Sequence, residues 1–363
     1  MKKIFQNFYK KTIYLLFKII YGKIIYLDVN IYDKKLLIEE VKDEKLLSPD
    51  KKKYLIFKII NGRICTDFVE NVAVISKNRI VDKASYQQVN GELKSSKYNS
   101  VIYKGTPYFK KKINGTVLSL TQGASGHKNY FHWLYDILPK IKICSSNYDL
   151  KKVDYLYLSN LEEYQKMTLK ILGLENINII DANRNRHIIA DQIITTEHPW
   201  YKKGFILEEA KKLPGWIVKW ISSTFLNYAE EFKCNEKIFI DRSESSFGHC
   251  QIQNNQEIIE FLKNKGFTSY KVGQLPFLNQ IFLFNNAKII IGAHGAAFAN
   301  LAFCKKNTKI IEIKPKNHPN LVDKRISEIN ELNFNFIETE EIPKNQTSSG
   351  DILLDPNLLE KLL

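Results

Sequence analysis

Three side chains in the first half of the chain have types and spacing that could perform acid–base chemistry. Asn129, His132 and Asp136 lie in the segment NYFHWLYDILPKI at i, i+3 and i+7, so a helix starting near Asn129 would carry them on one face. The carboxylate, one turn from the imidazole, could orient that ring or could itself take a proton from an alcohol. We favour Asp136 as the base, because His132 beside it would tend to be protonated. The alternative is a helix-capping Asn129 followed by a surface His–Asp pair.

A turn between a strand and a helix in the second half has the composition of an anion site. In residues 288–304, KIIIGAHGAAFANLAFC, an apolar strand ends at Gly292, and Gly295 and Ala296 open a helix. Small residues let an anion approach the backbone, and a helix N-terminus offers N–H groups and the positive end of its dipole. His294, at the mouth of the turn, could donate to a phosphate oxygen. The alternative is a tight turn in which Gly and Ala only allow close packing of helix on sheet.

Two charged residues accompany neighbouring strands. Arg242 follows the strand KIFID, and Glu312 interrupts the apolar strand TKIIEI, where an unpaired carboxylate would be costly. An arginine can clamp a diphosphate through two hydrogen bonds, and a glutamate can accept from both hydroxyls of a ribose. Each taken alone is more typical of a surface ion-pair partner or a rim residue, but together with the His294 turn they outline a nucleotide pocket.

The sequence lacks several motifs that would indicate other chemistry. No D-x-D triplet occurs, so paired aspartates that bridge a metal to a diphosphate are not expected, and we expect neither a metal nor a cofactor. The HExxH, P-loop and GxSxG patterns are also absent, which argues against a zinc protease, a P-loop ATPase and a serine hydrolase.

The elements that must position these residues alternate between helix and strand beyond Gly123. Strands alternating with helices of this length predict an α/β fold with parallel sheets covered on both faces, and such sheets bind ligands beyond the carboxyl ends of their strands. Before Leu120 the pattern instead favours short strands, at 54–60, 71–75 and 100–103. Later strands are expected at 154–159, 177–180, 192–196, 237–242, 267–272, 288–292 and 308–313, and helices near 129–143, 161–173, 214–228, 254–266, 276–287 and 296–303.

Length and composition indicate a folded protein of two domains with an anionic partner. The chain has 363 residues, about twice the usual domain size, with 44% hydrophobic and 26% charged residues. We expect an N-terminal domain at 26–205 and a C-terminal domain at 206–345, followed by a C-terminal helix at 346–363. Fifty-four Lys and Arg against 39 Asp and Glu give a net charge of +15, which suits nucleic acid, an acidic membrane or a phosphorylated small molecule. Five widely spaced cysteines indicate neither a disulfide framework nor a zinc site, and a reducing cytoplasm is the simplest compartment.

The first 25 residues predict a basic amphipathic helix. Six lysines are interspersed with aliphatic and aromatic residues, and the longest uncharged stretch, 12–17, is far shorter than the roughly 20 residues that a spanning helix needs. No small-residue cleavage site of a signal peptide follows. Such a helix could lie in the interface of an anionic bilayer, or it could pack on its own domain with the lysines at the solvent edge.

From about Gly123 to Pro315 the sequence resembles glycosyltransferase family 61, whose bacterial members are also described as capsule-polysaccharide proteins. NYFHWLYDILPKI in the first half, and IIGAHGAAFANLAFC followed by IIEI in the second, carry the resemblance, and KIFIDRS matches the family's strand that ends in Asp-Arg. The resemblance implies a GT-B-like protein, with two Rossmann-like domains facing a central cleft, an inverting reaction, a nucleotide-sugar donor and no required metal.

The resemblance also implies roles for particular residues. The C-terminal domain would bind the donor, and the helix with Asn129, His132 and Asp136 would face the cleft from the acceptor side. Many relatives carry further arginines after the Asp-Arg strand, but here no arginine follows Arg242 until Arg325. Diphosphate neutralisation would then rest on Arg242, His294, backbone amides and a lysine. The residues expected to bind the donor are Arg242, Gly292, His294, Gly295, Ala296, Asn300 and Glu312.

The expected function is sugar transfer to a hydroxyl of a glycan or lipid-linked glycan acceptor, in the synthesis of a capsule, O-antigen or other surface polysaccharide. The enzyme would be cytoplasmic, in contact with the inner face of the membrane. One alternative is a non-catalytic basic protein that binds acidic glycan or nucleic acid. Nucleic acid is disfavoured, because the chain has only six arginines and no helix-turn-helix or RNP pattern. Another alternative is a degenerate transferase retained as a subunit of a complex.

Overall fold

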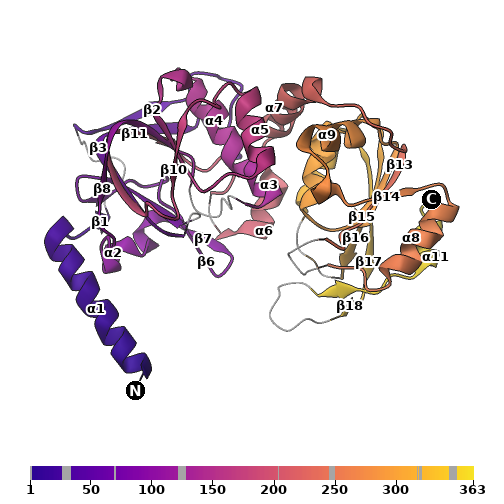
Figure 1. Ribbon diagram of the computed structural model, residues 1–363, viewed down its shortest axis with the longest axis horizontal. Helices are drawn as coiled ribbons and strands as arrows, with labels where there is room; N and C mark the ends of the chain where they lie inside the picture. The colour runs from indigo at the N-terminus through magenta and orange to yellow at the C-terminus, as the bar shows by residue number, and fades with distance from the viewer. Residues whose placement is uncertain are drawn as a thin grey trace. The chain divides into compact units, whose positions relative to one another are not determined.

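The chain folds into two compact units, Met1–Glu209 (unit 1) and Ala210–Leu363 (unit 2). The computed structural model shown in Figure 1 describes residues 2–26, 34–68, 71–121, 128–202, 204–244, 250–316, 318, 321–342 and 350–363. Both units combine helices with sheets, so the fold is α/β, as expected from the sequence.

Unit 1 is built on a nine-stranded mixed sheet in the order β1-β5-β4-β3-β11-β8-β9-β10, with β2 paired to β3. Strands β11, β8, β9 and β10 are parallel, whereas β3 pairs antiparallel with β2, β4 and β11. The expectation of a Rossmann-like first domain is therefore wrong for the part of the sheet from β2 to β5. There, strands that are consecutive in the sequence pair antiparallel with one another and are not joined by crossover helices. The strands are β1 (Ile25–Tyr26), β2 (Leu36–Glu40), β3 (Leu55–Phe68), β4 (Asn71–Ser76), β5 (Arg79–Ile80), β8 (Lys111–Ser119), β9 (Tyr155–Leu158), β10 (Asn178–Asp181) and β11 (His187–Thr196).

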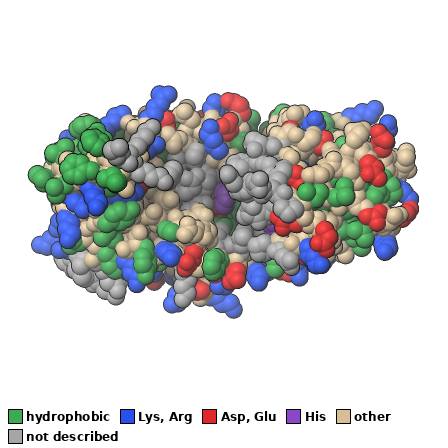
Figure 2. Space-filling view, turned by 90° about the horizontal axis from the view of Figure 1, so that it is seen from below, with side chains coloured by type: hydrophobic (Ala, Val, Ile, Leu, Met, Phe, Trp, Pro, Cys, Tyr) green, Lys and Arg blue, Asp and Glu red, His purple; other side chains and the backbone are tan. Residues whose placement is uncertain are grey.

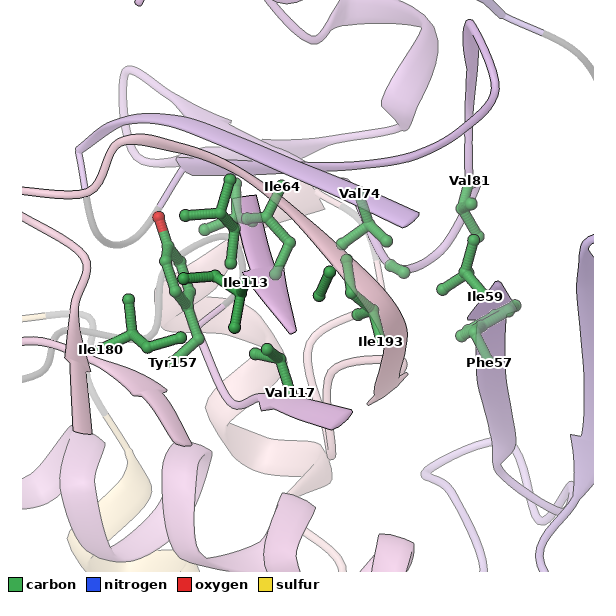
Figure 3. Close-up of a cluster of buried hydrophobic side chains, with 14 of the residues drawn as sticks. Phe57, Ile59, Ile64, Val74, Val81, Ile113, Val117, Tyr157, Ile180 and Ile193 are labelled. Atoms are coloured by element: carbon green, nitrogen blue, oxygen red, sulfur yellow. The ribbon is translucent and has the colours of Figure 1, made fainter. Parts of the chain in front are cut away.

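The core of unit 1 lies against this sheet. The strands supply β-branched and aromatic side chains, which suit a pleated surface that is buried. Figure 3 shows Ile113 and Val117 of β8 gathered with Ile64 of β3 and Tyr157 of β9, and all four side chains are buried. This packing fixes the register of β8 and β11, whose carboxyl ends carry the first group of candidate residues.

The segment expected as one helix at 129–143 is helical but irregular. It begins as α3 (Tyr130–His132), widens into a π-helix over Trp133–Ile137 and continues as α4 (Leu138–Ser145). The π-turn adds a residue to the helical repeat and shifts which side chains share a face, an irregularity that is frequent at functional sites. The remaining helices of unit 1 are α1 (Lys2–Tyr21), α2 (Val101–Lys104), α5 (Glu163–Ile171) and α6 (Ile206–Glu209), and a small sheet joins β6 (Gln87–Val89), β7 (Glu92–Lys94) and β12 (Gly204–Phe205).

The strand expected at 100–103 is wrong, since these residues form α2. The side chain of Asn99 accepts a hydrogen bond from the N–H of Val101 at 3.2 Å, which favours a turn at the start of α2. Val101 is buried and Tyr103 is exposed. A run of three apolar residues cannot by itself separate a strand from a helical turn.

Unit 2 has a five-stranded sheet in which all neighbours are parallel, in the order β14-β13-β15-β16-β17. Its strands are β13 (Lys237–Ile240), β14 (Thr268–Tyr270), β15 (Ile289–Ala293), β16 (Lys309–Pro315) and β17 (Asn333–Thr339). In chain order this is the arrangement 2-1-3-4-5 of doubly wound sheets. The parallel sheet expected for the second half is confirmed here.

Helices flank the sheet of unit 2, as Figure 1 shows for α8 and α9. Phe239, Ile291 and Ile311 on one face pack with Ile258 of α8 and Leu359 of α11. The helices are α7 (Gly215–Phe225), α8 (Asn255–Asn264), α9 (Phe277–Asn286), α10 (Val322–Ile329) and α11 (Pro356–Glu360). Two further elements are the 3-10 helix η7 (Ala296–Phe303) and the hairpin of β18 (Glu341–Ile342) with β19 (Asp351–Ile352). Among the described residues of 346–363, expected as a C-terminal helix, α11 is the helical part.

Candidate active site

The first group of polar side chains centres on Asp136 in unit 1. His132 Nδ1 lies 2.6 Å from Asp136 Oδ2, so the expected one-turn pair forms. Asp136 is fully buried, whereas about a quarter of the His132 side chain (26%) is exposed. Of the two residues, His132 is therefore the one that an external molecule can reach.

Two residues that follow β11 hold Asp136 from another side. The indole Nε1 of Trp200 donates to Asp136 Oδ1 at 2.8 Å, and His198 Nε2 lies 3.7 Å from Asp136 Oδ2. His198 and Trp200 are buried. Because β8 and β11 are parallel neighbours, their carboxyl ends meet at one edge of the sheet, and this brings the start of α3 close to His198 and Trp200.

The backbone sets the protonation of His198. Its Nδ1 accepts hydrogen bonds from the N–H groups of Trp200 and Tyr201, at 3.3 and 3.0 Å, so the proton of the neutral ring is on Nε2 and points to Asp136. Burial lowers the pKa of His198 to about 4, so this ring is neutral near pH 7. Burial would also raise the pKa of Asp136, but His132 and His198 outweigh it and lower that pKa to about 2.

An ionised Asp136 determines the state of His132. A carboxylate only accepts hydrogen bonds, so the Nδ1 of His132 must carry a proton, and in the neutral ring Nε2 is the atom that can accept one. Asp136 was expected to receive a proton from a substrate itself, but it is fully buried and already accepts hydrogen bonds from His132 and Trp200. The arrangement is that of an imidazole base oriented by a buried carboxylate.

Asn129 and Lys140 stabilise the surroundings of this pair. The Asn129 side chain caps α3 by accepting from the N–H of His132 at 3.2 Å, which matches the capping alternative considered for it. Lys140 is fully buried, and its Nζ donates to the carbonyl of Leu120 at 2.9 Å, directly after β8. Burial lowers the pKa of Lys140 to about 7.

The second group lies in unit 2, where the strand order reverses. Strand β13 has β14 on one side and β15 on the other, so the carboxyl ends of β13 and β15 flank the switch point at which doubly wound sheets bind ligands. Arg242 follows β13 and His294 follows β15. Glu312 lies on β16, opposite Gly292 in the parallel register. The sequence predictions Arg242, His294 and Glu312 are thus at one edge of one sheet.

His294 is bound by two carboxylates. Its Nδ1 lies 2.5 Å from Glu312 Oε1 and 3.1 Å from Asp323 Oδ2 of α10, and all three side chains are buried. Burial disfavours the charged imidazolium, but the two carboxylates outweigh it and raise the pKa of His294 to about 9. Burial and the neighbouring Asp323 raise the pKa of Glu312. His294 is therefore a protonated, positively charged group at neutral pH.

Arg242 is held against the same turn. Its Nη1 donates to the carbonyl of His294 and lies 3.5 Å from the carbonyl of Cys250. A Cβ added at Gly295 would come within 2.6 Å of Arg242 Cζ, so the glycine makes room for the guanidinium. Arg242 and the imidazolium of His294 thus lie together at the switch point, and the carboxyl groups of Glu312 and Asp323 oppose the charge of the imidazolium.

The residues around His294 also have the chemistry of a cation site. His294, Glu312 and Asp323 offer ligand atoms that all lie within 4.8 Å of one another. One imidazole with two carboxylates is a donor set that suits divalent transition metals. A shared proton and a divalent cation both fit this geometry, and the expectation of no metal rests on the missing D-x-D triplet and on the family resemblance.

The comparison with protein families shows which family the chain belongs to. The model of the family described as glycosyltransferase 61 matches residues 130–311, which is half of the chain and includes both groups except Asp323 and Glu312. The chain belongs to glycosyltransferase family 61. It is a glycosyltransferase, which favours an enzyme over the basic binding protein considered as an alternative. No curated protein shows a significant match to the chain.

Three further residues were expected to bind the donor in this family 61 enzyme, and the structure shows what surrounds each of them. Gly292 lies within β15, where an added Cβ would come within 2.8 Å of Ile240 Cβ. Asn300 is fully buried and donates to Gln280 Oε1 and to the carbonyl of Ala297, so its expected donor contact does not fit this position. Ala296 is half-buried at the start of η7, a 3-10 helix where an α-helix was expected.

Sequence reasoning missed His198, Trp200 and Asp323. His198 and Trp200 occur in HPW directly after a predicted strand, and that position was the available signal. Asp323 follows the last matched strand by eight residues and carries no motif. Residues 245–249, in the loop where relatives carry further arginines, lie outside the described part of the chain.

Proposed function

We propose that this glycosyltransferase moves a sugar from a nucleotide-sugar donor to a hydroxyl of a glycan acceptor, with inversion at the anomeric carbon. His132 Nε2 takes the proton of the attacking hydroxyl, and Asp136 orients the ring and stabilises the imidazolium that forms. The observation that supports this most is the His132–Asp136 pair, 2.6 Å apart, with its acid buried and its imidazole partly exposed. A base placed this way contributes typically about 10²–10⁴ in rate.

The donor would bind to unit 2, with its diphosphate at the carboxyl ends of β13 and β15. Arg242 and the charged His294 would neutralise the leaving diphosphate, and the backbone turn at Gly295 and Ala296 would add N–H donors. Preorganised cations stabilise a developing negative charge in the transition state, so no bound metal is required for departure. Glu312, buried beside His294, would set the charge of that imidazole.

The proposal needs both units to take part in one reaction, in the GT-B-like arrangement that the family resemblance implies. The acceptor group of unit 1 supplies the base and the donor group of unit 2 supplies the leaving-group site. A role in the synthesis of capsule, O-antigen or another surface polysaccharide is the biological setting that we propose with it. The supporting observations are the family resemblance and the positive charge of the chain.

Titration calorimetry with UDP, GDP and CMP, with and without EDTA, tests the donor half of the proposal. We expect one of the nucleotides to bind with equal affinity in both conditions. In a kinetic assay of sugar transfer, Arg242→Ala and His294→Ala should each lose about 2–4 kcal/mol of transition-state stabilisation. Binding that EDTA abolishes would assign the His294–Glu312–Asp323 group to a divalent cation, and no binding of any nucleotide would contradict the donor site.

A further inference from the structure

Helix α1 carries a large apolar surface that the rest of unit 1 does not cover. Phe8 and Ile19, for example, are 71% and 74% exposed. At about 100° per residue, the exposed apolar side chains occupy one continuous arc of roughly 160° of the helix circumference. We call this surface the apolar arc. Its members are Ile4, Phe5, Phe8, Tyr9, Leu15, Leu16, Ile19 and Ile20.

In the C-terminal half of α1, the side opposite the apolar arc is attached to unit 1. Phe17 is buried and packs edge-on against Phe109, with ring centroids 5.4 Å apart. Tyr21 packs against His187, with ring centroids 5.1 Å apart, and its hydroxyl accepts from the N–H of Lys110 at 3.1 Å. This attachment fixes the rotation of the helix, so the apolar arc faces outward because of packing contacts and not by chance.

The charge of α1 is of one sign. Its sequence, KKIFQNFYKKTIYLLFKIIY, holds five lysines and no acidic residue. On the helix circumference Lys11 and Lys18 border the apolar arc, and Lys10 is exposed on the far side of it.

Thr12 is a polar residue within the arc, and its hydroxyl is internally satisfied. The hydroxyl of Thr12 donates to the carbonyl of Phe8 at 3.1 Å, so burial of the arc leaves it with a hydrogen-bond partner. Figure 2 shows hydrophobic side chains with lysines beside them at the end of the molecule where Figure 1 places α1.

We propose that α1 is a membrane-surface anchor that inserts its apolar arc into the interface of an anionic bilayer. The arc supplies apolar area and aromatic rings for the boundary between headgroups and acyl chains, and the lysines at its edge pair with anionic headgroups. No helix in the described part of the chain is long and apolar enough to cross a membrane, so the proposed contact is one of a helix lying in the surface.

The proposed membrane anchor does not depend on the reaction that the enzyme performs. One consequence of the anchor, the class of acceptor, does rest on the proposed function. An enzyme held at a bilayer by α1 would meet acceptors at that surface, so a lipid-linked glycan is the acceptor class that fits. A second copy of the chain would be a poorer partner for the arc, because pairing two such helices would bring two sets of lysines together without an acidic counterpart.

Point variants test the anchor better than truncation. Deleting residues 1–25 would also remove Phe17, Tyr21 and Ile24, of which Phe17 and Ile24 are buried in unit 1. The arc variant Phe8→Ser/Ile19→Ser changes two exposed residues, and Gln6→Ser/Asn7→Ser is a matched control at two exposed polar positions of the same helix. A charge variant, Lys10→Gln/Lys11→Gln, keeps the arc and removes two exposed cations.

The measurement is co-sedimentation of the full chain with vesicles of phosphatidylcholine, alone or mixed with phosphatidylglycerol. We expect the wild type and the control to bind the anionic vesicles, and the arc variant to lose about tenfold or more in affinity. The charge variant should lose roughly fivefold per lysine on anionic vesicles only. Nucleotide binding, measured by calorimetry, should be the same in all four proteins, which separates failure of the anchor from failure of the donor site.

Three results would overturn the anchor. The first is binding by the arc variant that equals that of the wild type, and the second is a wild type that does not prefer anionic vesicles. The third is a wild-type dimer in light scattering that the arc variant dissociates, which would assign the arc to a second copy of the chain.

Discussion

At the scale of single residues, burial distinguishes the carboxylate of Asp136 from the adjacent imidazole of His132, although either group could accept a proton. Asp136 has no exposed surface. Trp200 Nε1 donates to its Oδ1, and His198 Nε2 lies 3.7 Å from Oδ2, the oxygen that His132 contacts. His132, and after it His198, outweigh the effect of burial and lower the pKa of Asp136, and the more exposed imidazole of His132 is the proton acceptor that we propose. Spacing in the sequence identifies the pair, but only the three-dimensional surroundings distinguish the base from the residue that positions it.

The two members of this pair should differ in how they fail. We expect His132→Ala to lose about 10²–10⁴ in single-turnover transfer while donor affinity is retained. Asp136→Asn should lose a comparable factor, since an amide no longer fixes the proton on Nδ1, and should also destabilise the fold by about 1–3 kcal/mol through mismatched buried partners. Asp50→Asn, at an exposed position, is the matched control.

The decisive variant is His132→Ala, followed between about pH 5 and pH 9. If it transfers sugar while Asp136→Asn does not, the base is Asp136 and the sequence-based preference was right.

The charge on His294 should make stability depend on pH in the alkaline range. Its pKa is raised from the ordinary 6.5 to about 9 in the folded chain, so its stabilising contribution is complete below about 6.5 and is lost as the pH rises through about 9. His294→Asn should lower Tm at neutral pH and remove part of the decrease in Tm between about pH 7 and pH 10. Glu312→Gln should move that decrease to lower pH, because one of the two carboxylates is gone.

Scanning calorimetry in EDTA, on these two variants and the wild type, measures this dependence. Parallel Tm curves for the wild type and His294→Asn would show that the imidazole contributes no pH-dependent stability.

At the scale of elements, the turn after β15 combines two requirements in one short segment. The strand must pack tightly on β13, which Gly292 allows, and the turn must leave room for Arg242, which Gly295 allows. A glycine at 295 is required by the neighbouring guanidinium and not by its own backbone, which is extended at φ 167°.

Gly295→Ala should therefore act through Arg242. The added Cβ displaces the far end of a flexible side chain, so we expect the fold to persist and nucleotide affinity to fall about tenfold or more, close to the effect of Arg242→Ala. Gly215→Ala is the control, since an added Cβ there meets nothing nearer than 3.8 Å. Titration calorimetry on the three variants measures the affinities. Wild-type affinity in Gly295→Ala, with a loss in Arg242→Ala, would disprove this coupling.

The elements that the sequence predicts best are those with long, uniform patterns. The apolar strands at β15 and β16 and the helix–strand alternation of unit 2 are found within a few residues of their expected bounds. The π-turn at Trp133–Ile137 could not be predicted, because it depends on how side chains such as Trp133, bonded to Thr168 of α5, pack in the tertiary fold. His198 and Asp323 could not be predicted for a similar reason. The partner of His198 is Asp136, 62 residues away, and the partner of Asp323 is His294, 29 residues away.

At the scale of the whole molecule, the two units share one design. Each places its polar group at the carboxyl ends of neighbouring parallel strands, β8 with β11 in unit 1 and β13 with β15 in unit 2. The proposed acid–base pair lies in unit 1, and the proposed donor-site residues Arg242 and His294 lie in unit 2. The proposed transfer reaction therefore requires the full chain, although unit 2 carries the proposed donor site.

The central claim, inverting transfer with His132 as the base, is tested most directly by the anomeric configuration of the product. Nucleotide sugars are incubated with the full chain in EDTA and a glycan acceptor, and proton NMR reads the configuration of the first product formed. If transfer inverts the anomeric carbon and His132 is the base, the wild type forms a product opposite in configuration to the donor, and His132→Ala does not form it. A product of retained configuration, or equal turnover by His132→Ala, would contradict it.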